Sequence, residues 1–404
     1  MKQLENIFRI LLCGSLCLIQ AAFCSVFAQQ SDSMDSIEIG LITCSPHEEV
    51  YSLYGHTALR YHNLKTKEDL TFNYGVFNYN QPFFVLRFVF GKTDYELGIA
   101  PFDDFCDYYK KWGSEVSEQV LNLTPQEKRR LAQALAINWE PENRVYRYNF
   151  FYDNCATRPR DIIERSLDGL LTYPPTVIPA PTFRQMVHEH TAHHPWAAMG
   201  NDLLLGVRAD MPTTQREQHF LPENLKRDFD QAYILTADSA RPLVKERRIV
   251  VPHGKQVVES EFPLSPNECM LVLTAIALGL FALEWRRRRT YAWWDATLMA
   301  VTGSAGILIG VMFFSEHPAT SSNLQALLLN PLHLIFLRQV VRRNAKTRYW
   351  SLLIVLIVLF VVGGFWQDYA EGMYYLALIL LSRYCIHKAE QRSFSVKGLL
   401  KRKI

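Results

Sequence analysis

The sequence predicts an exported α+β domain followed by a bundle of about five transmembrane α-helices. Three observations lead to this prediction: the chain opens with an export signal, its middle mixes strand patterns with a well-capped helix, and its last third consists of apolar runs separated by short polar loops. We expect a signal peptide over residues 1–28, an exported domain over 29–265, a membrane domain over 266–388 and a basic cytoplasmic tail over 389–404.

The amino-terminal segment has the composition of a secretory signal peptide. Basic Lys2 and Arg9 precede an apolar stretch over 10–27, and the small residue Ala28 stands before Gln29. A basic start, an apolar centre and a small residue at the cleavage point are the parts of such a signal. We therefore expect cleavage after Ala28, with an uncleaved anchor as the alternative. In both cases the residues that follow are exported.

Strand patterns open the exported domain. β-branched residues fill 37–44, and two further strand-like runs flank the polar turn at 65–69. Thr124 and Glu127 then form a capping box, which predicts a helix that runs to about Trp139.

An aromatic, strand-like run over 143–154 leads to Cys155. Beyond this cysteine, apolar residues recur at helical spacing as far as Leu171. Pro159 is tolerated only in the first turn of a helix, so Cys155 lies at or just before the amino terminus of this helix. A proline-rich loop follows, and 246–253 predicts a later strand.

Five apolar runs close the chain, and each approaches the length of about 17 to 25 residues that a bilayer crossing needs. They lie at 269–284, 291–314, 323–341, 350–366 and 372–387. Lys and Arg clusters follow the first, third and fifth runs, whereas the loops 315–323 and 367–372 contain neither residue. Because basic loops stay cytoplasmic, we expect a multi-pass protein of the inner (cytoplasmic) membrane, with the exported domain in the periplasm and the carboxyl terminus in the cytoplasm.

Charge and cysteine content limit the function classes. The formal net charge of +3 comes mostly from the cytoplasmic loops and tail, so it supports this topology and indicates no nucleic-acid partner. The exported domain keeps Cys44, Cys106 and Cys155, and an odd number of cysteines in an oxidising compartment leaves at least one free thiol or an intermolecular partner. Cys44 is expected to be buried or bonded to Cys106. The alternative, a disulfide between Cys44 and Cys155, would block Cys155.

Cys155 is the candidate nucleophile. A thiol at a helix amino terminus has its thiolate favoured by the helix dipole and by unpaired N–H groups. His56 is the candidate base, and Asn73 on the next strand is the candidate for orienting its ring, with His62 and Tyr74 as rivals. A cysteine and a histidine with purely structural roles remain the alternative.

The segment HEHTAHH at 188–194 lacks the spacing of a zinc protease, because position 192 is alanine where the motif needs histidine. We expect a polar helix end there, and no metal.

Four stretches resemble a known family. YSLYGHTALRY, FNYGVFNY, YRYNFFYDNCATRPRD and FLPENL, followed by five membrane spans, look like the Lnb-type lipoprotein N-acyltransferases. The order of a strand histidine, a polar residue on the next strand and Asn-Cys at a helix start is similar to that of circularly permuted papain-like folds, such as NlpC-related hydrolases and the lecithin:retinol acyltransferase group. The resemblance implies a permuted papain-like exported domain in which Cys155, His56 and Asn73 are catalytic.

The resemblance also implies an acyl transfer that needs no cofactor. Cys155 would take a fatty acyl group from a membrane phospholipid as a thioester and pass it to the α-amine of the lipidated cysteine of an apolipoprotein. The candidate substrate-binding residues are Asn154, Arg158, Tyr54, Tyr74, His317 and Asn323. The alternatives are a membrane-tethered papain-like cysteine hydrolase that acts on peptidoglycan peptides or lipids, and a non-enzymatic binding platform with a buried thiol.

Overall fold

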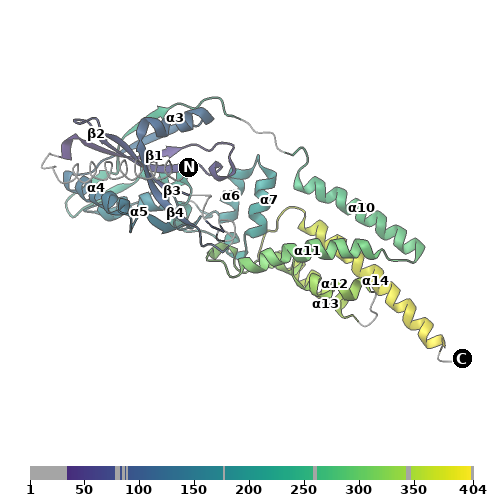
Figure 1. Cartoon of the computed structure of the whole chain (residues 1–404). Helices are drawn as coiled ribbons and strands as arrows, with labels where there is room; N and C mark the ends of the chain where they lie inside the picture. Colours follow the sequence, from purple (N-terminus) through teal and green to yellow (C-terminus); the bar gives the residue numbers. More distant parts are fainter. Residues whose placement is uncertain are drawn as a thin grey trace, which may run out of the picture.

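The structure is a computed structural model that describes residues 34–77, 82–83, 87, 90–175, 178–257, 262–342 and 347–401, with side chains as far as 390. The predicted signal peptide lies outside this part. The described residues form a sheet domain within 34–257 and a helical region within 262–401 (Figure 1).

A seven-stranded antiparallel sheet forms the centre of the sheet domain, with the strand order β10-β5-β1-β2-β3-β4-β6. The strands are β1 Ile37–Cys44, β2 His56–Asn63, β3 Asp69–Val76, β4 Asp94–Pro101, β5 Val116–Leu121, β6 Val145–Arg147 and β10 Val244–Val251. β1 is buried along nearly its whole length because it lies between two strands and under helices on the faces of the sheet. The predicted strands over 37–44 and 246–253 are thus present.

Helices pack on this sheet. They are α3 Phe102–Trp112, α4 Pro125–Trp139, α5 Thr157–Ser166 and α9 Pro222–Asp230. The predicted capping box begins α4: the Thr124 hydroxyl accepts from the Glu127 N–H, and the Glu127 carboxylate accepts from the Thr124 N–H. The side chains of α4, α5 and α9 bury against those of β1, β2 and β3 in the main core of the domain.

Two predictions near Cys155 were wrong in extent. The strand expected over 143–154 is only Val145–Arg147, because the Asn149 side chain accepts backbone hydrogen bonds and turns the chain. The helix expected to reach Leu171 ends at Ser166. The leucines beyond it belong to β7 Leu170–Thr172, which pairs with β8 Tyr233–Leu235 and then β9 Ala240–Pro242 in a second sheet. Their spacing suited a helix, but pairing with a distant strand decided their conformation.

Short helices connect the two regions. α6 Phe183–Thr191, α7 Pro195–Leu204, η3 Val207–Asp210 and α8 Gln215–Gln218 follow the second sheet's first strand. In Figure 1, α6 and α7 lie between the main sheet and the helical region.

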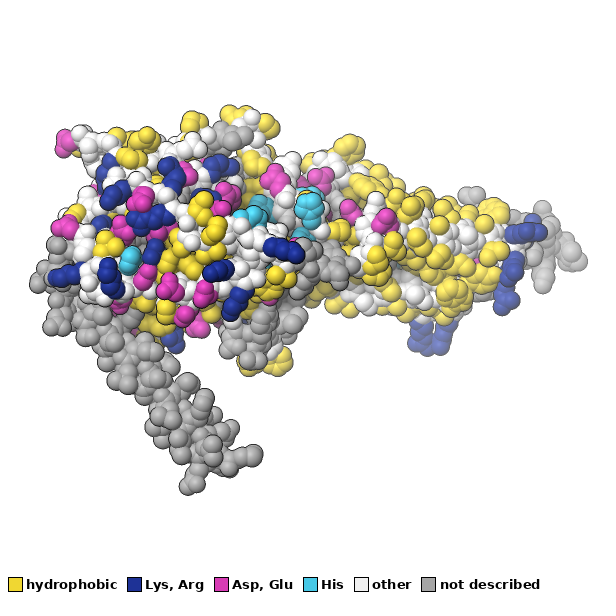
Figure 2. All heavy atoms as spheres, turned by 90° about the horizontal axis from the view of Figure 1, so that it is seen from above, with side chains coloured by type: hydrophobic (Ala, Val, Ile, Leu, Met, Phe, Trp, Pro, Cys, Tyr) yellow, Lys and Arg dark blue, Asp and Glu magenta, His cyan; other side chains and the backbone are white. Residues whose placement is uncertain are grey.

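The helical region contains α10 Pro266–Arg287, α11 Ala292–Met312, η4 Pro318–Thr320, η5 Leu324–Leu327, α12 Leu332–Val341, α13 Tyr349–Gly363 and α14 Met373–Lys401. Among the described residues, Pro266–Arg287, Ala292–Met312 and Leu324–Val341 are long and apolar enough to cross a membrane. Three of the five expected spans therefore meet that standard; α13 is apolar but shorter, with 15 residues. Figure 2 shows hydrophobic side chains over most of the visible surface of this region and basic side chains toward its far end.

The third of these segments is interrupted. η5 ends at Leu327, and α12 begins at Leu332, directly after Asn330 and Pro331. The helix breaks at this pair because proline cannot donate the backbone hydrogen bond of a continuous helix. The break packs on Gly306 of α11, where an added Cβ would lie 2.3 Å from the Asn330 Cα.

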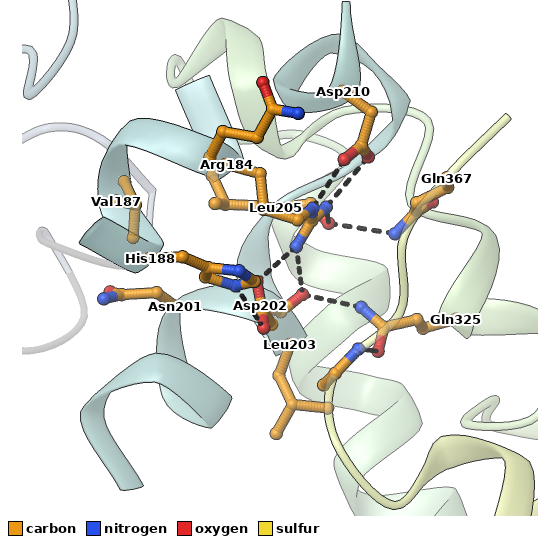
Figure 3. Close-up of polar contacts among 12 residues, drawn as sticks. Arg184, Val187, His188, Asn201, Asp202, Leu203, Leu205, Asp210, Gln325 and Gln367 are labelled. Carbon is orange, nitrogen blue, oxygen red and sulfur yellow. Dashed lines mark hydrogen bonds and ion pairs between the residues drawn. The ribbon is translucent and has the colours of Figure 1, made fainter. Parts of the chain in front are cut away.

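Side-chain amides of the helical region cap the carboxyl end of α7. Gln325 Nε2 donates to the Asp202 carbonyl at 2.7 Å, Asn323 Nδ2 to the Leu203 carbonyl at 2.8 Å, and Gln367 Nε2 to the Leu205 carbonyl at 3.0 Å. Figure 3 shows the first and last of these contacts. The last carbonyls of a helix have no partner within it. Here the loops between α11 and α12 and between α13 and α14 supply those partners.

A group of ion pairs lies at the same carboxyl end of α7. Arg184, only 1% exposed, donates to Asp202 Oδ1 at 2.6 Å and to Asp210 Oδ1 at 2.7 Å (Figure 3). His188 Nε2 lies 2.9 Å from both Asp202 oxygens. The sheet domain and the helical region are therefore joined through buried polar contacts at α6, α7 and η3.

Candidate active site

The fold brings His56, Asn73 and Cys155 together at one pocket. His56 is the first residue of β2, Asn73 lies on the neighbouring strand β3, and Cys155 stands just before α5, which contacts β2. The pocket has a volume of about 310 Å³. Its lining also includes Tyr51, Ser52, Tyr54, Gly55, Gly75, Val76, Phe77, Tyr95, Tyr108, Tyr109, Tyr148, Phe150, Asn154, Phe220 and Pro222.

Asn154 holds the turn that presents Cys155. Its Oδ1 accepts from the N–H groups of Ala156 and Thr157, each at 2.9 Å. Its Nδ2 donates to the Phe150 carbonyl at 2.9 Å and to a second buried carbonyl at 2.8 Å. The Asn154 amide is thus fully used by the protein, and its contacts explain why asparagine precedes the cysteine.

Gly75 lies beside Cys155, at an irregular point of β3. The pairing of β3 with β4 is irregular between Asn73 and Val76, and Gly75 within this interval has φ +95°. A Cβ at position 75 would meet the Cys155 Cβ at 3.7 Å, which is ordinary contact. The backbone angle, more than the space, therefore favours glycine here.

Asn73 fixes the orientation of the imidazole. Its Oδ1 lies 2.6 Å from His56 Nε2. Because this oxygen can only accept, Nε2 carries a hydrogen and Nδ1 is left for the side-chain hydrogen bond with Cys155. The histidine thus bridges the asparagine and the thiol.

The surroundings of the pair favour a thiolate beside an imidazolium. Burial raises the pKa of Cys155, but the charge of His56 and hydrogen bonds from His56 and the Thr57 backbone outweigh it, so the pKa is lowered. Burial lowers the pKa of His56, but the Cys155 thiolate and the hydrogen bonds with Cys155 and Asn73 outweigh it, so the pKa is raised. Both pKa shifts therefore favour the form in which the histidine carries the proton.

Two backbone N–H groups lie beside the sulfur of Cys155. Those of Thr57 and Cys155 both favour negative charge at the sulfur. The pairing of β2 with β3 begins only at Leu59, which leaves the first residues of β2 unpaired on the β3 side. The amino-terminal end of β2 can therefore donate into the pocket.

Tyr109 supports the other face of His56. The two rings stack with centroids 6.3 Å apart, and Tyr109 forms a hydrogen bond with Cys44. Cys44 and Cys106 are buried free thiols, so the disulfide considered between them is not formed. Burial raises the pKa of Cys44, and burial raises that of Cys106 to about 11, so both stay protonated at neutral pH.

The rivals of Asn73 lie elsewhere. His62 is near the opposite end of β2 from His56 and faces Glu38 of β1. Tyr74 is buried in the main core and its hydroxyl has no hydrogen-bond partner among the described residues. Neither lines the pocket.

Tyr54 is the other candidate substrate-binding residue, besides Asn154, that lines the pocket. Its hydroxyl accepts from Asn201 Nδ2 of α7 at 2.7 Å, and its ring lies 4.9 Å from that of Phe150. Tyr54 therefore connects the pocket wall to α7, the helix whose carboxyl end is capped by the loops of the helical region.

The remaining candidates do not reach the pocket. The Arg158 Nε lies 2.6 Å from Asp153 Oδ1, and its guanidinium covers the Tyr146 ring at 3.5 Å. His317 lies beside Gly91 of the sheet domain, where an added Cβ would be 3.1 Å from its ring. Asn323 belongs to the amide group that caps α7. These side chains connect parts of the fold.

The histidine-rich segment at 188–194 has structural partners. His188 bonds to Asp202, and His190 Nδ1 donates to the Met186 carbonyl at 2.9 Å. Within the described part of the chain, no group of three or more His, Cys, Asp or Glu side chains could hold a metal ion.

Sequence reasoning missed the aromatic lining of the pocket. Tyr108 and Tyr109 come from α3, and no motif marks them; Tyr51 of η2 (Val50–Ser52) begins the stretch YSLYGHTALRY but was not singled out. The available signal was the spacing of Phe105 and Tyr109, which places two aromatic rings on one face of α3.

Two family models match the chain. One describes the Lnb N-terminal periplasmic domain and matches residues 25–189; the other describes the Lnb transmembrane domain and matches residues 257–393. Together they span most of the 404 residues, and the first includes His56, Asn73 and Cys155. No curated protein and no solved structure matches the chain.

Proposed function

Because the chain belongs to the Lnb family, with a periplasmic domain and a transmembrane domain, we propose that it is a lipoprotein N-acyltransferase with Cys155 as its nucleophile. The observation that carries this proposal is the hydrogen-bonded pair of Cys155 and His56, whose pKa shifts favour a thiolate beside an imidazolium, in a pocket lined largely by aromatic rings. Such a pair suits acyl transfer because the attacking group is already ionised.

In the first half-reaction the Cys155 thiolate attacks an ester carbonyl of a membrane phospholipid. A carbon–sulfur bond forms, and the ester carbon–oxygen bond breaks as the His56 imidazolium gives its proton to the departing glycerol oxygen. The products are an acyl thioester on Cys155 and a lysophospholipid. Asn73 keeps the ring aligned while its proton is transferred.

In the second half-reaction the α-amine of the lipidated cysteine of an apolipoprotein attacks the thioester. The new carbon–nitrogen bond forms, His56 takes a proton from the attacking nitrogen, and the carbon–sulfur bond breaks. This restores the thiolate beside the imidazolium. Two half-reactions through one covalent intermediate predict ping-pong kinetics.

The oxyanions of both half-reactions need hydrogen-bond donors. We assign this role to the backbone N–H groups of Cys155 and Thr57, which already favour negative charge at the sulfur. Such donors are worth about 10²- to 10³-fold in rate when one is removed.

The attachment of the periplasmic domain to the membrane region supports a lipid substrate. The pocket wall at Tyr54 is bonded to α7, and α7 is capped by loops of the membrane region. Arg287 is the last residue of α10, which runs away from the periplasmic domain in Figure 1, and Arg342 directly follows α12. Basic residues at these helix ends support an inner-membrane protein with a cytoplasmic carboxyl terminus. A wall hydrolase needs only a single anchor.

The test is an acyl-adduct measurement on the purified full-length protein. We would incubate it with a labelled phospholipid, detect an adduct by intact mass, and check that hydroxylamine removes it. Cys155→Ala should form no adduct, and a diacylglyceryl-cysteine lipopeptide should receive the acyl group at its amine. Release of free fatty acid or cleavage of peptides through Cys155, with no transfer to the lipopeptide, would instead support a hydrolase.

A further inference from the structure

A carboxylate is hydrogen-bonded to two tyrosines of the pocket that holds Cys155. Glu49 directly precedes η2, and its Oε2 accepts hydrogen bonds from Tyr51 and, at 3.0 Å, from Tyr108. Both tyrosines line the pocket, and their hydroxyl oxygens are 3.3 Å apart. The two phenols therefore connect the carboxylate to the lining of the pocket.

The protein uses one oxygen of this carboxylate and leaves the other available. Both phenols bond Oε2, and no hydrogen bond from a described residue reaches Oε1. The Glu49 side chain is 28% exposed, so solvent and ligands can approach it. A carboxylate offers about four lone-pair positions, of which the phenols take two.

The negative charge of Glu49 has no fixed counter-charge in the described part of the chain. Its nearest basic neighbour is His47, whose Nδ1 lies 3.9 Å from Oε2. His47 is buried against Trp112, with ring centroids 4.7 Å apart, and its ring nitrogens have no hydrogen-bond partner. Burial lowers the pKa of His47, so its ring is neutral at neutral pH. The groups that face Glu49 are thus two phenols and an uncharged imidazole.

We propose that Glu49, held by Tyr51 and Tyr108, forms a subsite for a primary ammonium group, which the α-amine of the acceptor fills before it attacks the thioester. This inference rests on the proposed function. An α-amine has a pKa of about 8, so it arrives mostly as an ammonium at neutral pH. A charge-assisted hydrogen bond to Oε1 would draw this cation to the pocket, where the described lining residues include no Lys or Arg to repel it.

The subsite also completes the proton balance of the second half-reaction. An ammonium must lose two protons on becoming an amide nitrogen. One proton passes to Glu49 and from there to solvent, which leaves an uncharged, nucleophilic amine. The other passes from the attacking nitrogen to His56 as the carbon–nitrogen bond forms and the carbon–sulfur bond breaks. The thiolate and imidazolium are thereby restored.

The test separates the two half-reactions of the full-length protein in lipid nanodiscs. Thioester formation from phosphatidylglycerol, which has no ammonium, is measured first, and transfer to a diacylglyceryl-cysteine lipopeptide second. Glu49→Gln should leave thioester formation unchanged and raise the KM for the lipopeptide about tenfold at pH 7, the effect of one charge-assisted hydrogen bond. This defect should shrink above about pH 8, where the amine loses its charge.

Two controls isolate the charge of Glu49. Glu48→Gln changes the adjacent carboxylate, which forms no hydrogen bond with the described pocket residues, and should behave as the wild type. Hydroxylamine, an uncharged nucleophile at pH 7, should release the acyl group equally fast from wild type and Glu49→Gln.

The other outcomes are distinguishable. An unchanged acceptor KM in Glu49→Gln, with a normal thioester, overturns the inference and leaves the proposed function standing. Slower thioester formation from phosphatidylethanolamine but not from phosphatidylglycerol would assign the ammonium subsite to the donor headgroup and would also overturn it. Equal loss of thioester from both donors would make Glu49 structural. Absence of any thioester in the wild type defeats the proposed function itself.

Discussion

Cys155 and His56 share a proton whose position follows from their surroundings. Burial alone would keep Cys155 as a thiol, yet the neighbouring imidazole and the backbone N–H of Thr57 lower its pKa. The same proximity raises the pKa of His56. We therefore expect reactivity at this site to depend on both residues and to change when either is removed.

The first prediction concerns the pH dependence of thiol alkylation. In the wild type the rate of Cys155 alkylation by iodoacetamide should reach its plateau at a lower pH than that of an ordinary thiol, because the thiolate persists as pH falls through the usual thiol range. In His56→Ala only the backbone N–H groups of Thr57 and Cys155 still oppose burial, so the midpoint should move to a higher pH than in the wild type. Intact mass after timed alkylation measures both profiles, and a midpoint unaffected by His56→Ala would show that the two residues do not share the proton.

The second prediction concerns Asn73. Asn73→Ala removes the acceptor that holds His56 Nε2 at 2.6 Å, so the ring should sample other orientations and thioester formation should fall by about 100-fold. Asn73→Asp keeps an acceptor at this position and should retain much more activity. The measurement is single-turnover thioester formation, with His62→Ala as the matched control, since His62 lies near the far end of β2. Equal losses in Asn73→Ala and His62→Ala would argue against a role in orienting the ring.

At the level of single elements, the bend of β3 beside Cys155 depends on one backbone angle. Gly75→Ala should destabilise the protein by about 1–3 kcal/mol, since alanine does not tolerate a φ of +95°. Gly200→Ala is the matched control: Gly200 lies inside α7 with nothing within 4 Å of an added Cβ, so alanine should stabilise the protein by about 0.5–1 kcal/mol. Thermal unfolding followed by circular dichroism compares them. A neutral Gly75→Ala would mean that β3 relaxes without cost.

Local sequence signals predicted the elements they control directly. The capping box at Thr124 fixed both the start and the helical state of α4, and Pro159 placed Cys155 just before α5. The predicted end of α5 was wrong because Leu170 and Leu171 pair with β8, which lies far along the chain. The spacing of apolar residues reflects only neighbours in sequence, so it cannot predict pairing with a distant strand.

The candidate site was likewise predictable only in part. Cys155, His56 and Asn73 carry reactive or polar groups on elements whose order resembles a known family, and the structure brings them together. The contact of Glu49 with Tyr108 was not predictable, because Tyr108 belongs to another element, α3. The ion pair of Arg158, a candidate substrate-binding residue, with Asp153 was not predicted either. Side-chain partners that are distant in sequence leave no local pattern.

For the whole molecule, the joint between the two regions depends on amides that resemble ordinary loop residues in the sequence. Gln325 and Gln367 are fully buried, and both bond backbone carbonyls at the end of α7. The Gln367 Oε1 also accepts from the Leu324 N–H at 2.7 Å. One side chain therefore links the loop before α14, the loop before α12 and the periplasmic domain.

The last prediction follows from this joint. Gln367→Leu removes the hydrogen-bond partners of the Leu205 carbonyl and the Leu324 N–H. Each unsatisfied buried group should lower the free energy of unfolding by about 1–3 kcal/mol. We expect the backbone amides of α7 and η3 to exchange hydrogen faster. Glu371→Gln changes an exposed residue of the same loop and should leave exchange unchanged.

The same variant tests whether the joint acts on the pocket. α7 bonds the pocket wall through Asn201 and Tyr54, so loosening α7 should slow thioester formation from a phospholipid. The Cys155 thiolate depends on His56 and the backbone of Thr57, which α7 does not contact through any described hydrogen bond, so alkylation by iodoacetamide should be unaffected. If both rates fell together, the joint would be supporting the whole fold. A fall in the phospholipid rate alone would mean that the membrane region shapes the pocket for lipid while the sheet domain sets the chemistry.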